Sequence, residues 1–211
     1  MTKSITFISD DLVLEGIYHY PSSTKKVAGV LVCHPHTLYG GNMESTVVVS
    51  ICQALEKCSM VALRFNFRGA GKSQGTFDEG IGECNDLKAA LDFLSSLDRI
   101  DPLRIGLAGY SFGAGVAISA APQILSIKAI ALISPPFSRT TGFSSFKKDE
   151  RPKLIVTGGQ DSFISVEEVK RHTEQLKEPK RLEIISDTDH FWWDREKIAA
   201  QKVADFMAEK L

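Results

Sequence analysis

The stretch RIGLAGYSFGAGVAISAA at residues 104–121 combines a short apolar run, a sharp turn and a segment rich in small residues. The apolar run at 104–108 is typical of a strand buried on both faces of a parallel sheet. Gly109 and Gly113 flank Ser111 in the pattern G-x-S-x-G, because side chains in so tight a turn would collide with neighbouring elements. The stretch therefore predicts a strand, a turn that projects the Ser111 hydroxyl above the edge of a sheet, and a helix.

The rest of the chain repeats this alternation of strand-like and helix-like segments. Residues 5–9 and 12–20 alternate apolar and polar side chains, which predicts an N-terminal antiparallel hairpin. Short apolar runs follow at 28–33, 60–65, 104–108, 128–133, 153–157 and 181–186. Helical patterns fall at 45–58, 80–97, 112–124, 164–177 and 196–210. Ser45 is the expected N-cap of the first helix. Such alternation predicts a mostly parallel sheet with helices on both faces.

The size and composition indicate one domain spanning residues 1–211, with no linker or repeat. Lys and Arg total 25 and Asp and Glu total 26, so the net charge is −1. That balance lacks the basic surface that nucleic-acid binding requires. No apolar run approaches the roughly 18 residues of a membrane span, and the N-terminus has no apolar signal-peptide core. We therefore expect a cytoplasmic protein without nucleic-acid or membrane partners.

The four cysteines show neither a C-x-x-C pair nor a metal-ligand spacing. They are Cys33, Cys52, Cys58 and Cys84. Their even number would allow disulfides, but three of them lie in segments predicted to be strand or helix interior. Buried free thiols are the favoured interpretation for a cytoplasmic protein. The cysteines therefore predict no metal centre.

A second match to G-x-S-x-G surrounds Ser73, at residues 71–75. It is followed by loop-forming residues and not by an apolar helix, as a nucleophile turn requires. The same region suggests a phosphate-binding P-loop, but that motif needs glycine where the chain has Asn66, and no helix follows. Residues 67–80 are therefore interpreted as a glycine-rich loop at the rim of the site, and Ser111 as the nucleophile.

A serine hydroxyl needs a general base, and the base needs a carboxylate to orient it. In a sheet of this kind the partners lie on loops after later strands, in the order serine, acid, histidine. Asp161 and His190 each follow a later apolar run. Asp187 and Asp189 are alternative acids, but sequence neighbours of a histidine rarely reach its Nδ1 while Nε2 faces the serine. We favour Ser111, His190 and Asp161 as the catalytic residues.

The loop after the first buried parallel strand should supply a backbone N–H to the oxyanion. It begins with HPHT, and Pro35 has no N–H, so the donor is His36 or Thr37; we favour His36. The second donor is the N–H of Phe112 at the start of a helix. His34 and His36 could instead ligate a metal, but no third ligand lies at a recognisable spacing. We therefore expect neither a metal nor another cofactor.

Together these motifs resemble the small, lid-less bacterial α/β-hydrolases, labelled dienelactone-hydrolase-like or serine-aminopeptidase-like. The resemblance covers the chain from about residue 12 onward and rests on HPHTLYGGNM (34–43), RFNFRGAGKSQG (64–75), GYSFGAGVA (109–117), Asp161 and DHFWW (189–193). It implies a three-layer α/β/α sandwich with a triad of Ser111, Asp161 and His190, and oxyanion amides at Phe112 and near His36. True dienelactone hydrolases have cysteine at the nucleophile position, so Ser111 argues against that specific activity.

The expected site is open and shallow. Residues 134–152 leave little room for a lid, since a parallel crossover needs about a dozen residues merely to return. The walls are predicted to come from four apolar side chains: Leu38, Tyr39, Phe137 and Trp192. Packing of Trp192 and Trp193 between the last helix and the sheet is the alternative for that aromatic pair.

The predicted function is hydrolysis of small or medium carboxylic esters or thioesters through an acyl-enzyme on Ser111. The expected partner is thus a small-molecule ester or thioester. Alternatives are a non-catalytic binding protein that retains the fold, or an acyltransferase or peptidase that uses the same three residues.

Overall fold

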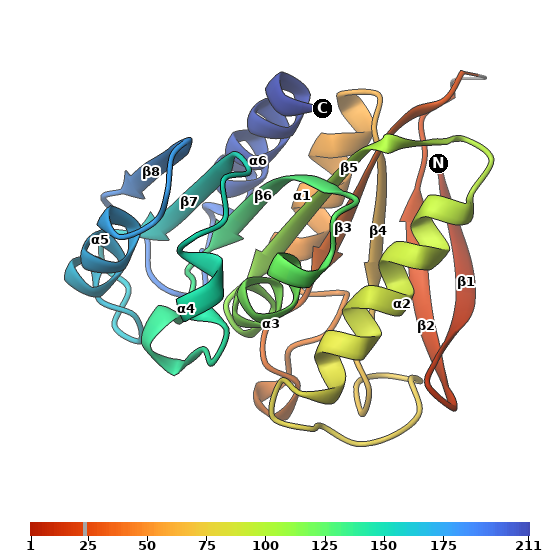
Figure 1. The fold of residues 1–211 in the computed structure, drawn as a ribbon, viewed down its shortest axis with the longest axis horizontal. Helices are drawn as coiled ribbons and strands as arrows, with labels where there is room; N and C mark the ends of the chain where they lie inside the picture. The colour runs from red at the N-terminus through yellow and green to blue at the C-terminus, as the bar shows by residue number, and fades with distance from the viewer. Residues whose placement is uncertain (23–24) are drawn as a thin grey trace.

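The computed structural model describes residues 1–22 and 25–211. Across these ranges eight strands form one sheet in the order β1-β2-β4-β3-β5-β6-β7-β8 (Figure 1). β1 (Thr2–Ser9) and β2 (Leu12–His19) form the predicted antiparallel hairpin, and β2 also pairs antiparallel with β4 (Val61–Phe65). The remaining pairs are parallel and involve β3 (Val27–Cys33), β5 (Ile100–Tyr110), β6 (Ile127–Ile133), β7 (Lys153–Gly158) and β8 (Lys180–Ile185).

Helices cover both faces of this sheet (Figure 1). α1 (Thr46–Lys57) and α6 (Glu196–Lys210) pack against each other on one face. The opposite face carries α2 (Gly82–Ser96), α3 (Phe112–Ala120), α4 (Phe143–Phe146) and α5 (Val166–Glu174). The predicted three-layer α/β/α sandwich is confirmed.

The central strand β3 explains why the apolar runs are continuous. Leu31 and Cys33 pack into the core beneath α2 and α3, whereas Val30 and Val32 pack into the core beneath α1 and α6. All four side chains are fully buried. A strand covered on both faces needs an apolar residue at every position, and burying each valine or leucine contributes roughly 1.5–3 kcal/mol.

The ends of two helices show local chemistry that periodicity does not reveal. α3 ends at Ala120, and the chain continues as a 3₁₀ turn (η2, Ala121–Gln123). Pro122 lies in that turn, and proline has no N–H to continue an α-helical ladder. Ser45 precedes α1 as predicted, but its hydroxyl accepts a hydrogen bond from the N–H of Asn42 and makes no bond to the helix.

The connection between β6 and β7 is short, as the sequence predicts. Residues 134–152 contain one 3₁₀ turn (η3, Phe137–Arg139) and the four-residue helix α4, which packs beside α3. Within the described ranges no lid covers the carboxyl ends of the strands.

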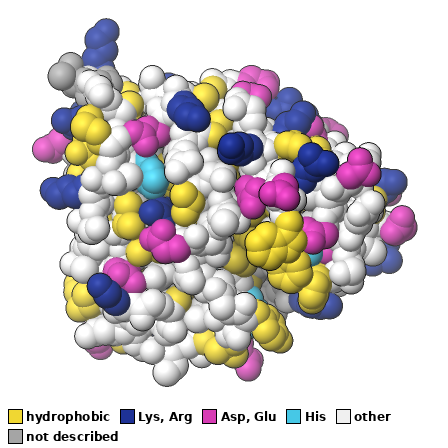
Figure 2. All heavy atoms as spheres, turned by 180° about the vertical axis from the view of Figure 1, so that it is seen from behind, with side chains coloured by type: hydrophobic (Ala, Val, Ile, Leu, Met, Phe, Trp, Pro, Cys, Tyr) yellow, Lys and Arg dark blue, Asp and Glu magenta, His cyan; other side chains and the backbone are white. Residues whose placement is uncertain are grey.

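The mixture of charges on the surface agrees with the net charge of −1, and the prediction of buried free thiols holds for two of the four cysteines. Acidic and basic side chains are interspersed over the face that carries α1 and α6 (Figure 2). In the part of the chain that the structure describes, the four cysteines are free, and Cys33 and Cys52 are buried. Among the described helices, none is both long and apolar enough to cross a membrane.

Candidate active site

Ser111 occupies a strained turn between β5 and α3. Its backbone has φ 53° and ψ −116°, a conformation that side-chain-bearing residues rarely adopt. A Cβ added at Gly109 would lie 2.5 Å from the carbonyl oxygen of Gly113, and one added at Gly113 would lie 2.6 Å from that of Cys33. Both flanking glycines are therefore sterically required. The turn is further held by a 2.8 Å hydrogen bond from the Ser111 N–H to the carbonyl of Ile133 in β6.

The structure joins the three predicted catalytic side chains in one hydrogen-bonded chain. Ser111 Oγ lies 3.0 Å from His190 Nε2, and His190 Nδ1 lies 2.8 Å from Asp161 Oδ2. Asp161 follows β7 and His190 follows β8, so residues 29 and 79 positions apart meet at one edge of the sheet. A proton on Nδ1 would be donated to the carboxylate, which leaves the Nε2 lone pair facing the hydroxyl.

The carboxylate is positioned by its own loop. Asp161 Oδ1 accepts hydrogen bonds of 2.9 Å from the N–H groups of Phe163 and Ile164. Burial opposes ionisation of Asp161, but the hydrogen bond and charge of His190, with those two N–H groups, outweigh it and hold the pKa of the carboxyl below its usual value. Asp189 has a different task, since its Oδ1 accepts from the N–H of Trp192 at 2.8 Å. The geometry thus joins Asp161, and not Asp189, to the imidazole.

The Tyr110 side chain also contacts the loop that carries His190, and the sequence did not predict this contact. Its hydroxyl donates a 2.7 Å hydrogen bond to the backbone carbonyl of His190. Burial, together with the charges of Asp161 and Asp189, raises the pKa of this phenol, so it stays a donor. The available signal was its place beside the nucleophile in the G-x-S-x-G pattern.

Ser73, the serine of the second G-x-S-x-G match, has a structural role. Its hydroxyl donates to the carbonyl of Asn66 at 2.7 Å and accepts from the N–H of Glu15 at 3.1 Å. The side chain is buried, with 8% of the residue exposed. These bonds fix the glycine-rich loop to β2, and the hydroxyl is already occupied on both sides.

The loop after β3 lies against the start of α3. His34 is fully buried; its Nε2 accepts from the N–H of Phe67 at 3.0 Å, and burial lowers its pKa to about 4. The ring of His36 lies 4.9 Å from the ring of Phe112, between ring centroids. The predicted oxyanion segments are therefore adjacent. No group of three or more potential metal-ligating side chains is found among the described residues.

Comparisons with known proteins show the family to which this chain belongs. Residues 28–209 match the family model described as an alpha/beta hydrolase domain. The chain belongs to the α/β-hydrolase family. It is 33% identical to an uncharacterised protein of Rickettsia prowazekii over 196 residues, covering 89% of this chain and 82% of that one.

Two solved structures are similar over nearly the whole chain. One is an alpha-beta serine hydrolase homologue from Coxiella burnetii, with 33% identity, a TM-score of 0.87 and 96% of both chains covered. The other is a serine hydrolase without a lid from Xanthomonas campestris, with 28% identity, a TM-score of 0.86, and 97% of this chain and 93% of that one covered. These likenesses support hydrolase activity for the present α/β-hydrolase in general terms.

Two of the four predicted wall residues do not line the site. Trp192 is completely buried in the core beneath α1 and α6, where its indole N–H donates to the Ser134 hydroxyl at 3.2 Å. Phe137 is 1% exposed, and its ring stacks on that of His172 at 5.5 Å. The prediction was wrong for both, because their side chains turn into the packed layers. Leu38 and Tyr39 are 66% and 87% exposed on the 3₁₀ turn η1 (Thr37–Tyr39), at the rim.

Other aromatic residues surround the triad in their place. Phe163 and Phe191 lie beside the imidazole of His190, with ring centroids 5.1 and 5.7 Å away. On the oxyanion side, the ring of Phe77 lies 4.7 Å from that of His36. Sequence reasoning missed all three, although Phe163 and Phe191 are within two positions of Asp161 and His190.

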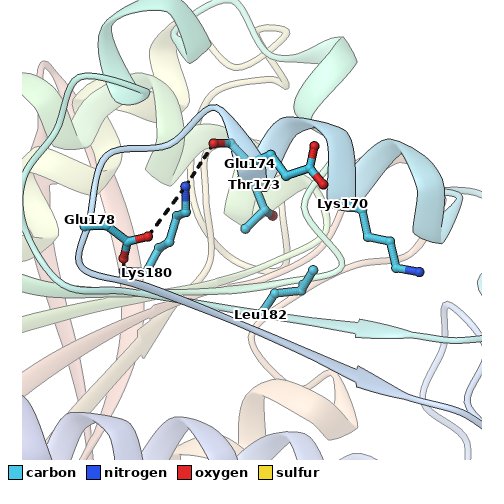
Figure 3. Close-up of a pocket in the computed structure, with 6 residues that line it drawn as sticks. All are labelled: Lys170, Thr173, Glu174, Glu178, Lys180 and Leu182. Atoms are coloured by element: carbon cyan, nitrogen blue, oxygen red, sulfur yellow. Dashed lines mark hydrogen bonds and ion pairs between the residues drawn. The ribbon is translucent and has the colours of Figure 1, made fainter.

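A surface hollow of about 230 Å³ lies elsewhere, between α5 and the start of β8 (Figure 3). It is lined by Lys170, Thr173, Glu174, Glu178, Lys180 and Leu182. Lys180 Nζ donates to the carbonyl of Glu174 and forms an ion pair with Glu178. The hollow is at the amino end of β8, whereas His190 follows its carboxyl end, so it is separate from the site.

Proposed function

We propose that this α/β-hydrolase cleaves small or medium carboxylic esters or thioesters through an acyl-enzyme on Ser111. The observation that carries the proposal is the chain of hydrogen bonds from Ser111 Oγ through His190 to Asp161. A hydroxyl, an imidazole and a buried carboxylate in this order form the arrangement that activates serine for attack on a carbonyl carbon. The exposed rim residues Leu38 and Tyr39 and the short connection between β6 and β7 support a small-molecule substrate that enters from solution.

In the first half-reaction His190 Nε2 takes the hydroxyl proton as Ser111 Oγ attacks the carbonyl carbon. The buried Asp161 carboxylate stabilises the imidazolium that forms and keeps the ring oriented. Nε2 then gives the proton to the departing alcohol or thiol, which leaves an acyl group on Ser111. In the second half-reaction Nε2 takes a proton from water, whose oxygen attacks the acyl carbon. The imidazolium then returns this proton to Ser111 Oγ as the bond between Oγ and the acyl carbon breaks and the acid is released.

The oxyanion that forms during attack needs backbone donors. We assign the N–H of Phe112 to this role, because it is the first residue of α3, where the helix dipole favours negative charge. The second donor is the N–H of His36, with Thr37 as the alternative. The proximity of the His36 and Phe112 rings supports this pairing. We also propose a cytoplasmic location, because free thiols persist in a reducing compartment.

Hydrolysis of p-nitrophenyl acetate tests the proposal. Ser111→Ala should lower kcat by about four orders of magnitude or more, as nucleophile removal does in serine hydrolases. Ser73→Ala is the matched control and should keep most of the activity. No turnover by the wild type would indicate a non-catalytic binding protein. Product partitioning to an added alcohol would instead indicate an acyltransferase.

A further inference from the structure

Three exposed aromatic side chains form a continuous surface beside the base. Phe163, Phe191 and Trp193 are 55%, 48% and 67% exposed. The ring centroids of Phe163 and Phe191 are 5.5 Å apart, and those of Phe191 and Trp193 are 6.2 Å apart. We call this set the aromatic shelf. Single exposed apolar residues are ordinary, but a contiguous exposed group marks a surface that binds something.

We propose that the aromatic shelf binds the leaving group and selects esters of uncharged aromatic alcohols. The proposal rests on the hydrolase function proposed above. It assigns a direction to the substrate, since the acyl carbonyl oxygen lies toward Phe112 and the alcohol portion lies over the shelf.

The chemistry of the base places the leaving group on this side. His190 Nε2 must hand its proton to the departing oxygen, so that oxygen lies within hydrogen-bond reach of the imidazole. The aromatic rings nearest to the imidazole are those of Phe163 and Phe191, with centroids 5.1 and 5.7 Å away, compared with 6.0 Å for Tyr110. A group attached to the departing oxygen therefore projects onto the shelf. Aromatic rings pair favourably in offset or edge-to-face geometry, so a planar aromatic alcohol gains more there than an alkyl one.

The shelf is held in place before any substrate binds. The N–H of Phe163 donates to Asp161, so the first ring is fixed by the catalytic carboxylate itself. Trp192, which stands between Phe191 and Trp193 in the sequence, is buried. Its backbone N–H donates to Asp189 and its indole N–H donates to Ser134. The buried tryptophan anchors the loop and leaves its two aromatic neighbours outside. A preorganised surface loses less entropy on binding.

Charge near the shelf favours a neutral leaving group. Asp187, Asp189 and Asp194 lie within the loop that carries Phe191 and Trp193, whereas Arg195 is its one cation. Asp187 and Asp194 are exposed. Figure 2 shows hydrophobic side chains gathered with acidic ones close by, on the half of the molecule that carries β7 and β8. An anionic leaving group would be repelled there, although salt screens the effect.

The test is a series of acetate esters that differ only in the alcohol: ethyl acetate, 2-naphthyl acetate and a sulfonated 2-naphthyl acetate. All form the same acetyl-enzyme, so differences between them report on acylation alone. For Phe191→Ala and Trp193→Ala we expect the ratio of kcat/KM for 2-naphthyl acetate to that for ethyl acetate to fall about tenfold from its wild-type value. The wild type should prefer the uncharged naphthyl ester to the sulfonated one at low salt.

The matched control is Leu125→Ala, which removes an 89% exposed apolar side chain in the turn before β6. This turn is at the amino end of β6, whereas the triad lies at the carboxyl ends of the parallel strands. It should leave the ratio at its wild-type value. An unchanged ratio in both shelf variants would overturn the proposal, as would a change in oligomeric state without a change in the ratio. If the wild type hydrolyses no ester, the proposed function itself fails. If it hydrolyses esters through Ser111 but the shelf variants keep the ratio, only the leaving-group assignment fails.

Discussion

Replacing Ser111 with glycine should stabilise the protein relative to replacing it with alanine. Ser111 has φ 53° and ψ −116°, and a residue held in such a sparsely populated region costs about 1–3 kcal/mol. Alanine has a Cβ and keeps that strain, whereas glycine relieves it. Glycine also has more conformational entropy than alanine in the unfolded chain, which destabilises the folded glycine variant by about 0.4–1 kcal/mol and offsets part of this gain. Both variants lose the hydrogen bond to His190, so this loss cancels in the comparison. The free energy of unfolding of Ser111→Gly should therefore be about 1 kcal/mol greater than that of Ser111→Ala.

The assay is thermal and urea unfolding of the two variants side by side. A difference of about 1 kcal/mol corresponds to a rise of roughly 2–4 °C in Tm for a chain of this size. Both variants should be inactive on p-nitrophenyl acetate, which separates stability from catalysis. A glycine variant that is no more stable than the alanine variant would refute the reasoning, because the turn would then carry no strain.

Three further predictions concern the acid, the buried histidine and the helix start. Asp161→Asn should lower kcat by about 10⁴-fold, as loss of the orienting carboxylate does in serine proteases, and Asp189→Asn far less; equal losses would leave the acid unassigned. Burial lowers the pKa of His34 from 6.5 to about 4, so its contribution to stability is complete above pH 6.5 and is lost as the pH falls toward 4. Urea unfolding should show a loss of up to about 3 kcal/mol over that window, and a difference between wild type and His34→Gln that is independent of pH would contradict it. Gly113→Ala should lower kcat at least about tenfold, because the new Cβ would displace the start of α3 from the oxyanion loop. Gly115→Ala is the control: its Cβ would lie 3.2 Å from a side-chain atom, so it should lower kcat less. Equal losses of kcat in the two variants would argue against the oxyanion assignment.

Local patterns were enough to predict the fold. The antiparallel hairpin, the parallel strands and the turn at Ser111 each depend on short-range features, such as alternation, apolar continuity and the two flanking glycines. These features have a direct steric or burial cause, so they can be read from neighbouring residues. The β3 strand illustrates this, since Val30 and Leu31 face different cores and are both apolar.

The walls of the site could not be predicted in the same way. Trp192 has a positive φ of 61°, a backbone conformation that is rare for residues with a side chain. The residue types in this loop do not predict such a turn, and so they do not predict the directions of the neighbouring side chains. The ring of Trp192 enters the core, whereas Phe191 and Trp193 stay outside. The side chain of Phe137 is likewise buried, and its ring stacks on that of His172 in α5. Which aromatic side chains face the substrate is thus decided by backbone turns and tertiary packing.

Reaction of the wild-type protein with a fluorophosphonate, followed by peptide mass spectrometry, tests the central claim most directly. An activated serine in contact with its base reacts with this reagent, whereas an ordinary hydroxyl does not. We expect a single adduct, located on Ser111, whose formation is greatly slowed in His190→Ala. An adduct on Ser73, or no adduct on the folded protein, would contradict the account.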